Sequence, residues 1–283
     1  MSVRQSYIVD EERKVLFKTI QYDEKGNIVS VNNHIAEPPF ETISTYNEKG
    51  DLVQEIEVQE GIEVSKFTYE YDDQQRITSQ KQFISDYLYS EVKTTYTEKG
   101  FERITTENEE EVEKLIRTDF EGEGEFQNDF FVNGEFKETQ IRTWDEANQT
   151  FRTRILDEVE DLFQTTIERF NEAGKELETI EESASGDLVS RITFQYEGNI
   201  SLATYVDYRE GYPLMKIRQE FDDKDRCILY ERLNDKEGVM EHRQYQFDED
   251  DRLIGEVNRL VGDFDSKNGV PLNNYRVVHE YQD

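Results

Sequence analysis

The sequence is organised by one short pattern that returns at an almost constant interval. Its clearest copy is Tyr22-Asp23-Glu24-Lys25-Gly26-Asn27-Ile28, in which an aromatic residue precedes an acid, a polar turn and an aliphatic residue. The copies lie 24 to 26 residues apart, and their anchor aromatics are Tyr22, Tyr46, Tyr71, Tyr96, Phe120, Trp144, Phe170, Tyr196, Phe221 and Phe247. A fixed interval of this length is typical of a repeat protein, in which each unit packs against its neighbours.

Each copy predicts a β-hairpin. Gly26 and Asn27 are residues that supply the positive φ of a tight turn. Phe67, Tyr69 and Tyr71 alternate with polar residues, which is the period of a strand. We therefore predict an all-β protein of about ten tandem antiparallel hairpins of ~25 residues, forming one elongated, twisted and curved sheet or a partly closed, barrel-like ribbon. One sheet face should be aromatic and aliphatic, and the other acidic and wet.

The repeats predict one domain, because no break in composition interrupts their interval. We expect a single repeat domain over residues 1–283, with an N-terminal cap strand in 1–13, hairpin repeats in 14–261, and an insertion loop with a C-terminal cap strand in 262–283. The cap strands are predicted near Gln5–Val9 and Tyr275–Tyr281, since an uncapped sheet edge invites aggregation.

The charge of the chain limits its partners. Acids number 65 against 33 bases, which gives a formal net charge of −32. Such a surface disfavours nucleic acid and anionic membranes and speeds encounter with a basic protein. Alternatively, the acids only solvate the surface. The beginning of the chain carries no apolar run, and Cys227 is the only cysteine, so we expect a cytoplasmic protein without disulfides.

The chemistry-bearing residues predict no enzyme and no cofactor. Paired acids fall in predicted turns and share one environment, whereas a catalytic pair needs two. His34, His242 and His279 lie far apart, and we expect each at the surface or a sheet edge. Cys227 has no base nearby and is expected to be a small buried apolar group. Trp144 replaces an anchor aromatic and is expected in the core.

One segment weakly resembles a calcium-binding loop. Asp263, Asp265 and Asn268 could supply its oxygen ligands. The asparagine, however, comes one position late for an EF-hand, and Tyr275 stands where the final glutamate should be. We regard these residues as weak metal candidates.

The anchor motif resembles the YD repeat of Rhs-type and teneurin-like proteins. The resemblance spans about Tyr22 to Leu253, and the copies at Phe221 and Phe247 are variants that carry Arg in place of Gly. It implies a spiralling ribbon of β-hairpins. Large Rhs shells enclose a toxin, but this chain is too short for a full shell and lacks the protease motif and toxin domain of such proteins.

Taken together, these features predict a non-enzymatic protein-binding module. Its most concrete form is a bacterial cytoplasmic immunity protein whose acidic surface neutralises a basic toxin domain. A structural module or scaffold of an Rhs-like or cell-surface assembly and a carbohydrate-binding repeat protein are the alternatives, and the oligomeric state stays open. The weak candidates for partner contacts are acids in the late turns: Asp222, Asp223, Asp248, Asp250 and Asp251.

Overall fold

The chain is all-β in a computed structural model, which describes residues 2–9, 13–209, 214–260 and 274–282. No helix occurs in these ranges, so they contain none long and apolar enough to cross a membrane. The strands are β1 (Ser2–Val9), β2 (Lys14–Tyr22), β3 (Ile28–Asn33), β4 (Phe40–Tyr46), β5 (Leu52–Gln59), β6 (Ile62–Tyr71), β7 (Ile77–Ile84), β8 (Tyr87–Thr97), β9 (Gly100–Glu107), β10 (Glu110–Asp119), β11 (Phe126–Val132), β12 (Glu135–Asp145), β13 (Thr150–Leu156), β14 (Leu162–Phe170), β15 (Glu176–Ser183), β16 (Leu188–Glu197), β17 (Ile200–Asp207), β18 (Met215–Phe221), β19 (Cys227–Leu233), β20 (Val239–Phe247), β21 (Leu253–Leu260) and β22 (Asn274–Gln282).

The contacts divide these strands between two compact units. Unit 1 comprises Met1–Glu91 and Met240–Asp283, and unit 2 comprises Val92–Val239. In unit 1, β1 to β7 follow one another as antiparallel neighbours, and β20 to β22 do the same. In unit 2, β9 to β19 are consecutive antiparallel neighbours. The all-β character and the antiparallel hairpins expected from the repeat are therefore confirmed.

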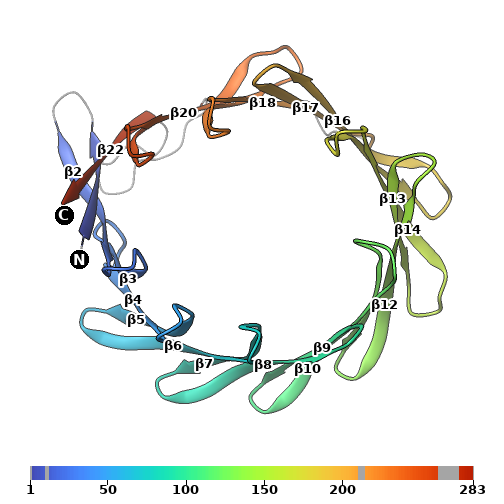
Figure 1. The fold of residues 1–283 in the computed structure, drawn as a ribbon, viewed down its shortest axis with the longest axis horizontal. Coiled ribbons are helices and arrows are strands. Elements are labelled where there is room, and N and C mark those ends of the chain that lie inside the picture. Colours follow the sequence, from blue (N-terminus) through green and yellow to red (C-terminus); the bar gives the residue numbers. More distant parts are fainter. Residues whose placement is uncertain (1, 10–12, 210–213, 261–273, 283) are drawn as a thin grey trace. The chain divides into compact units, whose positions relative to one another are not determined.

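The first and last strands of the chain pair with each other. In unit 1, β1 lies between β2 and β22 (Figure 1). Ser6 stands opposite His279, and Ile8 stands opposite Val277. The strands near Gln5–Val9 and Tyr275–Tyr281 were expected as caps of a partly closed ribbon. The partly closed detail is wrong at this junction, because each terminal strand satisfies the backbone edge of the other. Neither strand is left with an unpaired edge.

Nine turns in the described ranges share one hydrogen-bonding scheme over five residues. The backbone N–H of the first residue bonds the carbonyl of the fifth, and the N–H of the fourth bonds the carbonyl of the first. The first side chain accepts the N–H of the fifth residue and, in most of these turns, that of the third. The first residues are Asp23, Asn47, Asp72, Asp157, Asn171, Ser183, Asp222, Asn234 and Asp248. Short polar side chains favour such turns because they replace backbone hydrogen bonds locally.

The fourth residue of each turn has a positive φ. This shows that the late repeats were aligned incorrectly when Arg was placed at the position of the glycine. Gly26 has φ +86°, and the equivalent residues of the late turns are Asp225 at +58° and Asp251 at +65°. Arg226 and Arg252 therefore do not replace the glycine. They occupy the fifth position, where each Nε donates to the carboxylate of its turn's first residue at 2.8 Å.

The interior is thin and largely polar. Four hydrophobic side chains in the described part of the chain are buried: Ile8, Ile20, Ile167 and Val277. Many of the buried polar residues are hydroxyl-bearing, and several donate to a carboxylate on a neighbouring strand, including Ser30 to Glu41 at 2.7 Å and Ser65 to Glu57 at 2.9 Å. A single-layer sheet explains this, since its side chains are covered mainly by neighbours on the same face.

Candidate functional site

The five acidic partner candidates fall in two turns with the same internal structure. Asp222 and Asp248 are half-buried first residues, whose carboxylates are occupied by backbone N–H groups and by Arg226 and Arg252. The hydrogen bond from the Arg226 side chain, opposed by desolvation, lowers the pKa of Asp222 to about 2. These two carboxylates therefore hold the turns together.

The remaining three candidates are exposed at the tips of these turns. Asp223 lies in unit 2, and Asp250 and Asp251 lie in unit 1. Asp250 also contacts the Arg252 guanidinium at 3.3 Å. These three candidates thus lie in two turns that belong to separate units. Their exposed carboxylates can meet a partner, whereas those of Asp222 and Asp248 are engaged within the turn.

The calcium-loop candidates Asp263, Asp265 and Asn268 lie outside the described residues. Within the described ranges, no group of three or more His, Cys, Asp or Glu side chains is arranged to hold a metal ion.

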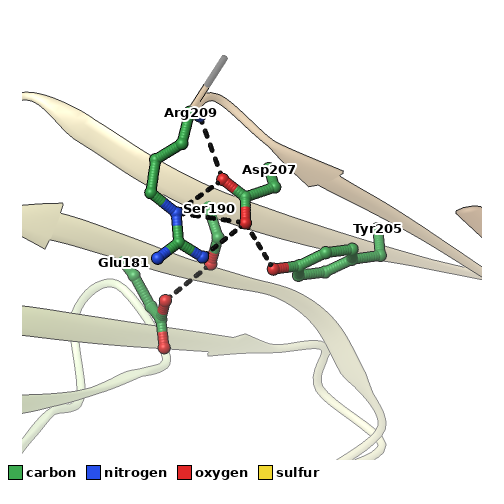
Figure 2. A network of polar contacts seen from close by, with 5 residues as sticks. All are labelled: Glu181, Ser190, Tyr205, Asp207 and Arg209. Carbon is green, nitrogen blue, oxygen red and sulfur yellow. Dashed lines mark hydrogen bonds and ion pairs between the residues drawn. The ribbon is translucent and has the colours of Figure 1, made fainter. Parts of the chain in front are cut away.

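A buried polar network surrounds Asp207 at the end of β17 in unit 2. Glu181, Ser190 and Asp207 stand directly opposite one another across β15, β16 and β17. The Ser190 hydroxyl donates to Glu181 at 2.7 Å. The Arg209 guanidinium and the Tyr205 hydroxyl converge on Asp207 (Figure 2). Arg209 donates from Nε at 2.9 Å and from Nη2 at 2.5 Å, and Tyr205 donates at 3.2 Å.

This network keeps Asp207 ionised. Its side chain is 1% exposed, whereas that of Arg209 is 60% exposed. Hydrogen bonding from the Arg209 side chain outweighs desolvation and holds the pKa of Asp207 well below its usual range. Burial, followed by the charge of Asp207, raises the pKa of Tyr205. A carboxylate so strongly stabilised is a poor general base near neutral pH, so the arrangement fits a structural role at the strand end.

A second buried network joins the terminal strands. Ser6 Oγ lies 2.8 Å from His279 Nδ1, and His279 Nε2 lies 3.0 Å from Glu256 Oε1. The prediction of a surface or edge position for His279 is wrong, because this residue is only 7% exposed. Ser6 is 1% exposed, which leaves a substrate no approach to its hydroxyl. Ser6, His279 and Glu256 are residue types found in catalytic triads, but the buried serine cannot act as a nucleophile on a substrate. They satisfy one another between β1, β22 and β21.

The other predicted chemistry-bearing residues take ordinary positions. His34 is exposed and lies 2.9 Å from the Thr19 hydroxyl, and His242 is half-buried. Cys227 is half-buried rather than fully buried, and its thiol donates to the carbonyl of Leu229 at 3.2 Å. Burial is the main reason why its pKa is raised. A thiol held in this protonated form is a weak nucleophile.

Comparisons with known proteins place the chain in no family. No family model matches it, and no curated protein does. Solved structures with some likeness include TcdB2-TccC3-Cdc42, with 11% identity over 96% of this chain and 15% of that chain and a TM-score of 0.46. TcdB2-TccC3 matches at 10% identity over 90% of this chain and 16% of that chain, with a TM-score of 0.41. A porin-like protein from Bacteroides uniformis matches at 9% identity over 99% of this chain and 96% of that chain, with a TM-score of 0.33.

The lengths differ greatly in the first two comparisons. This chain spans only about a sixth of the TcdB2-TccC3 and TcdB2-TccC3-Cdc42 chains that it overlaps. Likenesses of this degree assign no activity, substrate or partner to the chain.

Proposed function

We propose that this chain is a non-enzymatic protein-binding module whose acidic surface holds a basic partner. Its most concrete form is a bacterial cytoplasmic immunity protein that neutralises a basic toxin domain. The observation that carries the proposal is the excess of acids, expressed by the formal net charge of −32. Opposite charge accelerates the encounter of an acidic surface with a basic partner, and like charge disfavours acidic partners.

The distribution of the basic side chains supports this proposal. Arg169 and Arg191 both donate to the buried carboxylate of Glu178, at 2.8 and 2.6 Å. Arg226 and Arg252 are engaged in their own turns. Since these four cations serve internal contacts, they leave less basic charge to oppose the exposed acids.

The repeat chemistry supports a further part of the proposal, that the chain is a YD-type repeat protein. The acid of the motif organises its turn, and the tyrosine of the motif bonds the preceding repeat, as in Tyr46 to Ile28 at 2.9 Å. The same contacts also favour the alternative of a structural repeat module, because they tie one hairpin to the next without requiring a partner.

A capture experiment distinguishes these two functions. The tagged chain is incubated with extract at low salt and eluted toward about 1 M salt, where the Debye length is only about 3 Å. We expect a basic protein to elute as salt rises. Retention that is independent of salt, or no retained protein, would contradict the binding proposal and favour the structural module.

Matched variants test whether the turn acids contribute. The combined substitutions Asp223→Asn, Asp225→Asn and Asp250→Asn remove exposed charge from two turns. We expect weaker capture by this variant. The control is Lys236→Gln, which removes an exposed cation from a turn of the same type and should maintain or strengthen capture. Equal effects of both changes would exclude a specific role for acidic charge.

A further inference from the structure

A solvent-accessible hollow in unit 2 combines aromatic and acidic walls. It has a volume of about 670 Å³ and lies where the turn between β10 and β11 meets the strands β12 and β13. We call it the aromatic hollow and define it by Glu123, Gly124, Glu125, Trp144, Glu146 and Phe151. Trp144 was expected in the core, and it does pack on neighbouring rings. It also lines this open hollow, which was not predicted from the sequence.

The aromatic wall is built by directly paired residues. Trp144 on β12 stands opposite Phe151 on β13, and their ring centroids are 4.6 Å apart. Phe170 packs against both rings, at 6.2 Å from Trp144 and 6.1 Å from Phe151. Three mutually packed rings restrict one another's rotamers, so the wall keeps its shape without a ligand.

The turn before β11 also lines the hollow. Gly124 has a φ of +76°, and a Cβ atom on this residue would lie 3.1 Å from the Phe151 ring. Glu125 Oε1 accepts the backbone N–H of Trp144 at 2.6 Å, which fixes this turn against β12. A side chain larger than glycine at position 124 would therefore press on the aromatic wall.

Carboxylates provide the charge of the hollow. Glu123 and Glu146 are exposed, and Glu125 is half-buried. No lysine or arginine belongs to the lining. Nearby, the Arg142 guanidinium lies 4.1 Å from the Phe151 ring centroid and 2.9 Å from the Glu168 carboxylate. One ring of the cluster thus already interacts with a cation that is paired to an acid.

We propose that the aromatic hollow receives an arginine or lysine side chain of a basic partner polypeptide. The cationic head would meet the carboxylates, and the apolar stem would lie against Trp144 and Phe151. Tryptophan is the strongest cation–π partner among the side chains, and the surrounding acids add attraction that a neutral ligand does not gain. The proposal rests on the proposed function in that it names the contact through which a basic partner is held.

The single tryptophan makes the hollow directly observable, because Trp144 is the only one in the chain. A short arginine peptide is titrated while Trp144 fluorescence is recorded, and a matched citrulline peptide supplies the same shape without charge. We expect a saturable change with the arginine peptide and at least about tenfold weaker binding of the citrulline peptide.

Paired variants locate the response. Glu123→Gln combined with Glu146→Gln removes two exposed charges and should weaken arginine-peptide binding about tenfold with the unfolding midpoint unchanged. Glu172→Gln combined with Glu249→Gln removes two exposed charges from other turns and should leave binding within about twofold. Equal binding of both peptides, equal effects of both double variants, or a response to a neutral oligosaccharide alone would overturn the proposal.

The outcomes separate this inference from the proposed function. Salt-sensitive capture of a basic protein without any response of Trp144 to the peptide would contradict the inference. The proposed acidic binding surface would still be supported. Peptide binding at the hollow without any captured protein would support the inference and contradict the proposed function.

Discussion

The hydroxyl of Tyr71 donates a hydrogen bond of 2.7 Å to the backbone carbonyl of Leu52 in the preceding repeat. Leu52 is the first residue of β5 and directly follows the five-residue turn that begins at Asn47. The same relationship joins Tyr46 to Ile28, Tyr196 to Glu176, and Tyr281 to Leu253, at 2.9 to 3.0 Å. In each case the acceptor begins the strand that follows an earlier turn. Tyr46 and Tyr71 therefore connect repeats, while the residue after each of them, Asn47 or Asp72, shapes its own turn.

Removing this hydroxyl should loosen one junction. Tyr71→Phe is expected to destabilise the protein by about 1 kcal/mol, the net value of a typical hydrogen bond. The measurement is the midpoint of urea unfolding. Tyr69→Phe is the matched control, because the Tyr69 hydroxyl makes no hydrogen bond to the described residues. Equal losses in the two variants would show that the hydroxyl of Tyr71 contributes nothing specific.

The fourth position of the turns predicts two substitutions of opposite sign. Glu160 has φ +64° and Gly174 has φ +74° in turns of the same type. Gly174→Ala should cost about 1 kcal/mol, because an L side chain disfavours this backbone conformation, and Glu160→Gly should be neutral to stabilising by about 1 kcal/mol. Thermal unfolding reports both. Glu172→Ala, in the same turn but without positive φ, should stay within about 0.5 kcal/mol of the parent chain. A stabilising Gly174→Ala would contradict this account.

The junction of the terminal strands depends on a buried polar pair. Ser6→Ala removes the partner of His279 Nδ1 and leaves a buried nitrogen unsatisfied. We expect a loss of about 1 to 3 kcal/mol in the free energy of unfolding. Ser2 is half-buried on the same strand, and Ser2→Ala is the control. This substitution should leave the free energy of unfolding nearly unchanged. A similarly small loss for Ser6→Ala would mean that water replaces the serine.

Acid should weaken the turn of Asp222 over a defined range. The folded pKa of about 2 lies below the ordinary value of 3.8, so the contribution of the carboxylate is present above pH 3.8 and is lost as the pH falls toward 2. Asp222→Asn preserves the amide-type turn found at Asn171 and Asn234 but removes the charged pair with Arg226. The stability difference between the parent and this variant should shrink as the pH falls.

Exposed Asp223 supplies the comparison for this acid titration. Asp223→Asn removes an exposed charge from the same turn while leaving the pair of Asp222 and Arg226 in place, so it is the matched control. An NMR titration of the Asp222 carboxyl with a midpoint near 3.8 would refute the assigned role.

Local rules account for the part of this protein that was predictable. The alternation of aromatic and polar residues around Tyr71 identified strands, and the Asp and Gly of each motif identified turns, because both depend on a few neighbouring residues. The one-position misalignment at Asp225 and Asp251 arose because an acidic residue there adopts the positive φ usually reserved for glycine. The exposed acids at the turn tips were likewise predictable from the same local pattern.

Tertiary structure decided which distant residues meet. Ser6 and His279 are separated by 273 positions, and no local pattern pairs the first strand with the last. Trp144 and Glu125 come together only because β12 and the turn before β11 are fixed by strand register. The sequence determined a chain of acidic hairpins because side-chain alternation and turn chemistry act locally. Register and strand pairing, which act across the sheet, decided which polar groups are buried and which rings line an open hollow.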